Sequence, residues 1–197
     1  MDEEGVNQSR RRFLTWTTTA VGAVGAGFTA VPFLNYWNPS ARAQAAGAPV
    51  EQDISKLKPG QTINIEWRGK PVMVYRRDEG ELETLKAITE RLRDPESEVD
   101  QQPEYCTNAY RSIRPEIGVI VAICTHLGCS PKYRPEPDSV GDDWPGGLYC
   151  PCHGSKFDLA GRVYKGVPAP MNLEVPPHWF PREDVIIVGE HQEGGAA

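Results

Sequence analysis

An uncharged, apolar stretch near the amino end is the first feature of the hydrophobic and polar pattern along the chain. No residue from Phe13 to Ser40 carries a charge. As a helix, residues 13–37 would be roughly 37 Å long at ~1.5 Å per residue, and a bilayer's hydrocarbon core is ~30 Å thick. The pattern therefore predicts one transmembrane anchor over residues 13–37.

The residues on either side of this anchor indicate how it is inserted. Ser9–Thr15 reads Ser-Arg-Arg-Arg-Phe-Leu-Thr, which resembles a twin-arginine export signal. Its arginines place residues 1–12 in the cytoplasm. After the anchor, residues 38–50 are small, polar or proline and predict a flexible neck. Within that neck, Ala41-Arg42-Ala43 leaves cleavage by a signal peptidase as an alternative.

Residues 51–197 are expected to form one mainly β domain. Four runs rich in β-branched or aromatic residues predict strands: Thr62–Trp67, Pro71–Arg76, Ile117–Ile123 and Val185–Val188. Arg68-Gly69-Lys70 between the first two indicates a hairpin. One helix is predicted from apolar residues at helical spacing: Leu82, Leu85, Ile88 and Leu92. Asp78 and Glu81 form its possible capping pair, and Asp94-Pro95 is its expected stop.

Charge narrows the partners that this domain would suit. Four of the 21 basic and three of the 27 acidic residues precede residue 51, which leaves 17 basic and 24 acidic residues in the domain. Nucleic-acid binding depends on lysine and arginine clusters that neutralise phosphates. We therefore expect no nucleic-acid partner for this acidic domain.

The chemically active residues gather in two short boxes, Cys124-Thr125-His126-Leu127-Gly128-Cys129 and Cys150-Pro151-Cys152-His153-Gly154-Ser155. Each box offers one thiolate and one imidazole, as Cys-x-His and Cys-x-x-His. Two sulfur and two nitrogen ligands suit either a tetrahedral zinc site or a mixed-ligand [2Fe–2S] cluster. Zinc fingers usually pair Cys with Cys and His with His, whereas each box here supplies one of each. That arrangement favours the two-iron centre.

The boxes resemble those of the Rieske iron–sulfur subunit of the cytochrome bc1 complex, and the resemblance extends over anchor, neck and domain. It implies a Rieske-type antiparallel β-sandwich with an inserted cluster-binding subdomain at about residues 122–171, tethered to a single N-terminal transmembrane helix. It also implies electron transfer from ubiquinol to a cytochrome c-type haem, within a quinol–cytochrome c reductase. The expected partners are cytochrome b and cytochrome c1-type subunits of a dimeric complex in the bacterial inner membrane, with the domain in the periplasm.

The resemblance assigns a role to each cysteine and histidine of the boxes. Cys124 and Cys150 would bind one iron of a single [2Fe–2S] cluster, and His126 and His153 the other iron. The two histidines would also hydrogen-bond quinol and couple proton transfer to electron transfer. The remaining pair, Cys129 and Cys152, would form a disulfide. Such a bond persists in an oxidising compartment, which export supplies.

Further positions are expected to tune the cluster or to contact partners. Ser155 matches a hydroxyl that donates to a cluster sulfur. Phe157 stands where many family members carry a tyrosine whose hydroxyl contacts a ligand sulfur. We therefore expect a reduction potential below that of a tyrosine-bearing relative. A docking tip is expected from four residues: Leu127, Gly128, Pro168 and Pro170. The last two belong to Gly166–Pro170, which resembles the family's proline-rich loop.

Two alternative functions follow from the same residues. A Rieske subunit of a periplasmic molybdenum oxidase, such as arsenite oxidase, would share the boxes and the export route. A structural zinc domain would use the same four ligands without redox chemistry. Outside the boxes, Cys106 is expected to be a spectator thiol, and residues 130–149 are expected to be mainly a solvated acidic loop. No role is assigned to His178 or His191.

Overall fold

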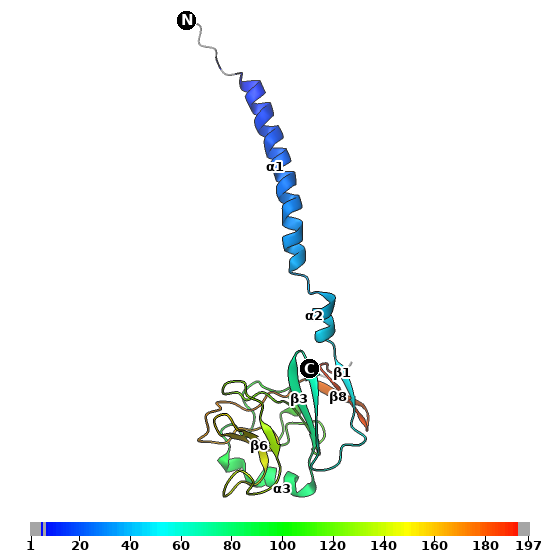
Figure 1. Ribbon diagram of the computed structural model, residues 1–197, viewed down its shortest axis with the longest axis vertical. Helices are drawn as coiled ribbons and strands as arrows, with labels where there is room; N and C mark the ends of the chain where they lie inside the picture. Colours follow the sequence, from blue (N-terminus) through cyan, green and yellow to red (C-terminus); the bar gives the residue numbers. More distant parts are fainter. Residues whose placement is uncertain (1–4, 6, 193–197) are drawn as a thin grey trace. The chain divides into compact units, whose positions relative to one another are not determined.

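The computed structural model describes residue 5 and residues 7–192, which fall into two compact units, Met1–Ala45 and Ala46–Ala197. The first unit consists mainly of one long helix, α1 (Gln8–Tyr36), drawn in blue in Figure 1. The side chain of Asn7 accepts a hydrogen bond from the backbone N–H of Arg10 and caps the first turn. The helix therefore contains nearly all of residues 13–37 and also the arginines before them.

Helix α1 presents apolar side chains along its whole length. None of its residues is buried, and Phe28 is 78% exposed. The hydroxyls of Thr15, Thr17 and Thr29 donate to backbone carbonyls one turn earlier, so these groups are satisfied without water. Among the residues that the structure describes, α1 lies in the one helical stretch that is long and apolar enough to cross a membrane.

The segment predicted as a neck is not wholly irregular. A short helix, α2 (Ala41–Ala46), lies within residues 38–50. Four of its six residues are alanine, the strongest helix former, and the hydroxyl of Ser40 accepts a hydrogen bond from the N–H of Ala43. Val50 already belongs to a strand, one residue before the expected start of the domain.

As far as residue 192, the second unit contains three antiparallel sheets of three strands each, which confirms a mainly β fold. The first sheet has the order β1-β9-β8, with β1 (Val50–Asp53), β8 (His178–Arg182) and β9 (Val185–Val188). The second has the order β2-β3-β4, with β2 (Thr62–Trp67), β3 (Lys70–Arg76) and β4 (Ile117–Val121). The third has the order β5-β6-β7, with β5 (Lys132–Arg134), β6 (Gly147–Cys150) and β7 (Ser155–Phe157).

The first two sheets form a sandwich because they share one hydrophobic core. Val72 of β3, Val119 of β4 and Ile186 of β9 are all fully buried in that core. All four predicted strands are present, and the hairpin pairs Thr62 with Tyr75 through to Trp67 with Lys70. The third sheet was not predicted and lies inside the expected subdomain at about residues 122–171.

The predicted helix is present but shorter than expected. Helix α3 (Glu79–Ala87) begins with the predicted capping box, in which Asp78 and Glu81 each bond the other's backbone N–H. It ends before a single 3-10 turn, η1 (Thr89–Arg91), and Leu92 is already extended and forms a bridge with Tyr164. Tertiary pairing therefore overrides the helical spacing in this last turn. A second short turn, η2 (Glu104–Cys106), lies in the loop before β4.

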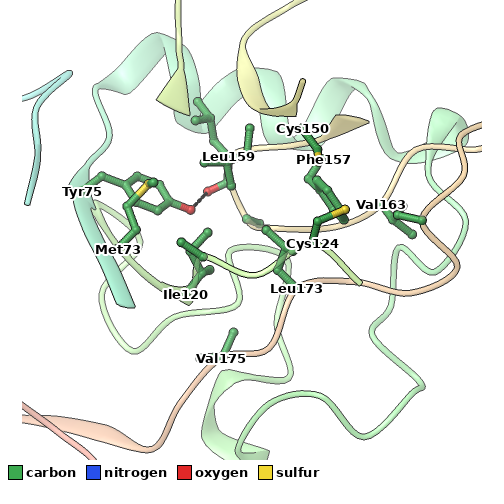
Figure 2. Close-up of a cluster of buried hydrophobic side chains, with 14 of the residues drawn as sticks. Met73, Tyr75, Ile120, Cys124, Cys150, Phe157, Leu159, Val163, Leu173 and Val175 are labelled. Carbon is green, nitrogen blue, oxygen red and sulfur yellow. Dashed lines mark hydrogen bonds between the residues drawn. The ribbon is translucent and has the colours of Figure 1, made fainter. Parts of the chain in front are cut away.

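A second core lies between β3, β4, α3 and the third sheet (Figure 2). It contains Tyr75, Leu159 and Leu173, and also the two box cysteines Cys124 and Cys150. The hydroxyl of Tyr75 donates to the carbonyl of Leu159 at 2.6 Å, which satisfies the one polar atom of this ring inside the core. The box thiols are therefore built into the hydrophobic interior of the domain.

Candidate metal centre

The first box is a tight loop that follows strand β4. The N–H of Cys124 donates to the carbonyl of Cys129 at 2.8 Å, and the N–H of Gly128 donates to the carbonyl of Cys124 at 2.9 Å. Gly128 has φ +81°, a conformation that glycine adopts without strain. These bonds close the loop and hold His126 and Leu127 at its outer side, where Leu127 is 70% exposed.

The second box is the turn of a hairpin. Cys150 ends β6 and pairs with Ser155, the first residue of β7. The N–H of Gly154 donates to the carbonyl of Cys150 at 3.0 Å, and Gly154 also has a left-handed φ of +76°. The turn therefore buries Cys150 and Ser155 and leaves His153 exposed.

A disulfide between Cys129 and Cys152 joins the two loops, with Cα atoms 6.6 Å apart. It is the pairing that the family resemblance implies. The rings of His126 and His153 lie edge to face with centroids 4.9 Å apart. The sulfur of Cys150 lies within 4.8 Å of both disulfide sulfurs. Because those two sulfurs are bonded to each other, they are not available as metal ligands.

The four remaining donors fit a metal centre of mixed ligation. Cys124 and Cys150 are unoxidised and each is 2% exposed. Burial raises the pKa of the Cys150 thiol, and a hydrogen bond with Cys124 raises it further, so the two thiols are neighbours. Nδ1 of His126 is buried and has no hydrogen-bond partner among the described residues. A buried imidazole nitrogen without a partner is costly, and a metal ion would satisfy it.

Ser155 and Phe157 lie behind the two boxes on strand β7, and neither is exposed. The Ser155 hydroxyl oxygen accepts a hydrogen bond from the N–H of Ala169 at 3.0 Å. Its own proton is therefore left to donate, which the predicted bond to a cluster sulfur requires. Phe157 belongs to the same core cluster as Cys124 and Cys150 (Figure 2).

The predicted proline-rich loop, residues 166–170, is anchored through Ala169. This alanine is fully buried and bonds Ser155, whereas Pro168 and Pro170 on either side of it are exposed. One contact was missed from the sequence: the hydroxyl of Thr125 donates to the carbonyl of Met171 at 2.7 Å. This bond ties the first box to the end of the proline-rich loop. The sequence did contain a signal for this contact, because a residue with a hydroxyl lies between the two proposed ligands Cys124 and His126.

A cavity of about 570 Å³ borders Cys124, and the sequence did not predict it. Its lining includes Gln101, Gln102 and His191. An ion pair between Lys70 and Glu174, 2.9 Å long, also borders it. The first box therefore has an exposed outer side and an inner side that faces this cavity.

Three further predictions concern residues outside the boxes. Cys106 is fully buried, and burial raises its pKa to about 12, so this thiol is protonated and unreactive at neutral pH. His178 is also buried, and burial lowers its pKa to about 4. In the insertion at 130–149, Asp142 and Asp143 are exposed as expected. Trp144 is not solvated, because it packs against Tyr164 and donates to the carbonyl of Arg134.

The β-sandwich, the two disulfide-linked boxes and the four donors define the class of Rieske iron–sulfur proteins. A family model described as the Rieske [2Fe-2S] domain matches residues 94–177. Another, described as the TAT signal of the ubiquinol–cytochrome c reductase Fe-S subunit, matches residues 1–40. The cofactor of this domain is a [2Fe–2S] cluster, and the export signal predicted from the arginines is confirmed.

Close relatives identify the family more narrowly. The chain is 58% identical over 192 residues to the ubiquinol–cytochrome c reductase iron–sulfur subunit of Allochromatium vinosum, which covers 96% of this chain and 93% of the relative. It is 43% identical over 185 residues to the subunit of the same name from Rhodospirillum rubrum, covering 94% of each. The Blastochloris viridis subunit is 41% identical over 181 residues, covering 92% of this chain and 93% of the relative. The chain belongs to the family of ubiquinol–cytochrome c reductase iron–sulfur subunits.

Proposed function

We propose that this chain carries electrons from ubiquinol to a cytochrome c-type haem, as the mobile iron–sulfur subunit of a bacterial quinol–cytochrome c reductase. In this proposal Cys124 and Cys150 hold one iron of the [2Fe–2S] cluster, and His126 and His153 hold the other. The observation that carries the proposal is the convergence of the two boxes. Two buried thiols, two imidazoles in contact and one unpartnered Nδ1 come together beside a disulfide.

The cluster, when bound, takes up and releases one electron, and imidazole ligation favours its reduced form, with Rieske potentials of about −150 to +300 mV. The residues of the chain supply the rest of the function. His153 is exposed, so its outer nitrogen can accept a hydrogen bond from a quinol hydroxyl and then hold the proton. Leu127, also exposed, can enter an apolar docking surface on cytochrome b.

The anchor and neck give the domain its range of motion in this proposal. Residues 1–12 remain in the cytoplasm, residues 13–37 span the inner membrane and residues 51–197 lie in the periplasm. The domain docks alternately on cytochrome b and on a cytochrome c1-type subunit of a dimeric complex. Residues 38–50, with α2 between two irregular segments, act as the linker that allows this exchange.

Electron paramagnetic resonance of dithionite-reduced membranes tests the cluster and the function together. We expect a Rieske signal that shifts when a quinone-site inhibitor is added. His126→Ala and His153→Ala should each abolish the signal, whereas His191→Ala, an exposed histidine outside the boxes, should retain it. A colourless protein that contains zinc, or a signal that survives loss of either box histidine, would contradict the proposal.

The same experiment separates this function from that of a molybdenum oxidase subunit. A subunit of such an oxidase would co-purify with a molybdenum enzyme and would not respond to a quinone-site inhibitor. The chain's relatives named above are reductase subunits and favour co-purification with cytochromes b and c1. Recovery of the chain in a soluble complex without haem would refute our assignment.

A further inference from the structure

The domain buries an arginine that has no carboxylate partner. Arg111 is 1% exposed, and among the described residues no carboxylate oxygen lies within ion-pair distance of it. Its Nη1 donates to the carbonyl of Ala160 at 3.2 Å and its Nη2 to the side-chain oxygen of Gln102 at 2.7 Å. Its Nε has no partner in the described chain. All its hydrogen-bond acceptors are therefore neutral.

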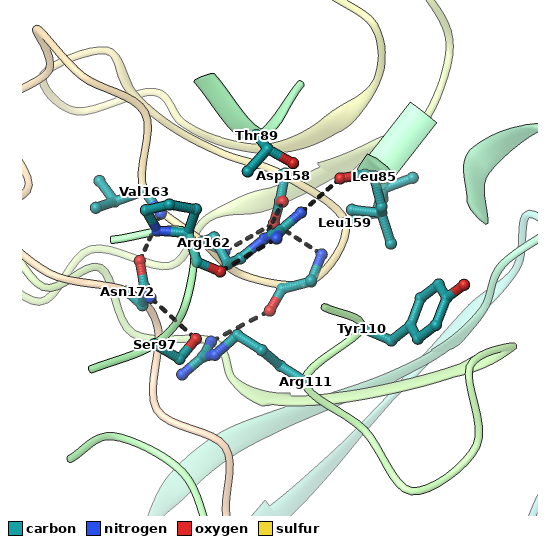
Figure 3. Close-up of polar contacts among 12 residues, drawn as sticks. Leu85, Thr89, Ser97, Tyr110, Arg111, Asp158, Leu159, Arg162, Val163 and Asn172 are labelled. Atoms are coloured by element: carbon teal, nitrogen blue, oxygen red, sulfur yellow. Dashed lines mark hydrogen bonds and ion pairs between the residues drawn. The ribbon is translucent and has the colours of Figure 1, made fainter. Parts of the chain in front are cut away.

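The neighbouring buried charges do not cancel this cation. Asp158 is fully buried, but it is bound by Arg162 through a 2.7 Å ion pair, so those two side chains neutralise each other (Figure 3). Arg77, 3% exposed, donates to the carbonyls of Leu159, Pro115 and Tyr110 and to one serine hydroxyl, which are again neutral groups. The interior therefore holds excess positive charge inside an acidic domain.

Keeping Arg111 in this place is costly. An ion that is removed from water loses its favourable solvation, and neutral hydrogen-bond acceptors replace only part of what is lost. Burial lowers the pKa of Arg111 to about 10, which still leaves it charged at neutral pH. The backbone at Arg111 is also in the left-handed region, with φ +48°, which a side-chain-bearing residue adopts at a cost. Departures from the usual burial of charges and from the usual backbone conformation are expected where function requires them.

Arg111 lies against the core that contains the two ligand thiols. A Cβ placed on Gly161 would be 3.3 Å from Nη1 of Arg111 and 3.3 Å from both Ile120 and Leu173, so Gly161 packs closely against all three side chains. Ile120 and Leu173 belong to the core cluster of Cys124 and Cys150 (Figure 2). Arg111 also donates a hydrogen bond to Gln102, and Gln102 lines the cavity that borders Cys124.

We propose that Arg111 is an electrostatic tuning residue, which raises the reduction potential of the cluster by stabilising its more negative, reduced state. This inference rests on the ligation proposed above. Acidic side chains on the surface oppose reduction of the cluster, but salt largely screens their effect beyond about 10 Å. A buried cation acts on the cluster through the apolar core, where salt screens it much less. Arg111 would thus supply part of the stabilisation that Phe157 cannot give.

The size of the effect follows from Coulomb's law. In a medium of effective dielectric constant about 20, a unit charge that acts across one layer of packed side chains, on the order of 10 Å, changes a one-electron equilibrium by roughly tenfold. Arg111→Gln should therefore leave about tenfold less reduced cluster at a fixed ambient potential, a shift of about −59 mV.

The test is a redox titration of the membrane-bound complex, followed by the signal of the reduced cluster. Gln102→Glu is a second variant, because its carboxylate would neutralise Arg111 at the existing 2.7 Å contact without removing the arginine. Like Arg111→Gln, it should lower the fraction of reduced cluster at a fixed ambient potential. If the Arg111→Gln protein does not fold and accumulate, Gln102→Glu alone tests whether the charge of Arg111 sets the potential. Lys132→Gln is the matched control, since it removes an exposed cation from β5 and should leave the potential unchanged.

The outcomes separate this inference from the proposed function. A normal cluster signal with titration curves of Arg111→Gln and Gln102→Glu within twofold of the unchanged chain would overturn the tuning role alone. An equal shift in Lys132→Gln would also overturn it, because the effect would then be one of overall charge. Absence of any Rieske signal in the unchanged chain would refute the ligation on which the inference rests.

Discussion

Replacing Phe157 with tyrosine should raise the reduction potential of the cluster. Phe157 is fully buried in the core that contains Cys124 and Cys150, so a hydroxyl added to its ring would lie in apolar surroundings, and the family resemblance gives a ligand sulfur as its acceptor. A hydrogen bond to a sulfur that becomes more negative on reduction stabilises the reduced state more than the oxidised state. With a net worth of about 1 kcal/mol for one bond, the expected rise is about 40 mV.

The assay for Phe157→Tyr is a redox titration of the membrane-bound complex against the unchanged chain. Phe180→Tyr is a suitable control, because this half-buried residue of β8 packs against the other core of the domain. A hydroxyl that found no acceptor would instead lower the unfolding free energy by about 1 to 3 kcal/mol without moving the potential. An unchanged potential with an intact cluster signal would refute the reasoning.

Three further predictions follow from the structure. Replacing Cys129 and Cys152 together with serine opens a cross-link with a sequence separation of 23 and should lower the unfolding free energy by about 3 kcal/mol, as measured by urea titration. His178 should make the unfolding free energy fall by about 3 kcal/mol in total between pH 6.5 and pH 4, because its folded pKa of about 4 lies below its unfolded value and the unfolded chain binds the proton first. His178→Gln should remove this pH dependence, and an unaltered dependence would exclude His178 as its source. Gly47→Pro with Ala48→Pro would extend Pro49 into a stiff segment and should slow quinol oxidation while leaving the cluster signal intact; normal turnover would count against a swinging domain.

Features set by local sequence could be predicted. The capping box of Asp78 and Glu81 depends on two residues three apart, and the strand Val185–Val188 depends on four consecutive β-branched residues; both are present as expected. The two boxes could be found because ligand chemistry fixes their residue types. The apolar helix likewise follows from composition alone.

Features set by distant contacts could not be predicted. Strands β5 and β7 have three residues each and exist because β6 lies between them. Trp144 lies in an acidic loop, and its packing on Tyr164 and its hydrogen bond to the carbonyl of Arg134 explain its burial. Arg111 is one arginine among many in the sequence, and its position in the core becomes visible only when residues 102, 111 and 160 are brought together.

The three loops around the donors are joined to one another as well as to the sheets. The disulfide links the first box to the second, Thr125 links the first box to Met171, and Ser155 links the second box to Ala169. Each loop is therefore held at two places, so the donor atoms have little freedom to rearrange. We expect a small reorganisation energy for each electron transferred, because loops that are tied to one another in this way let the ligand side chains move little when the charge of the site changes. The speed of electron exchange would then depend on how often the domain reaches each partner.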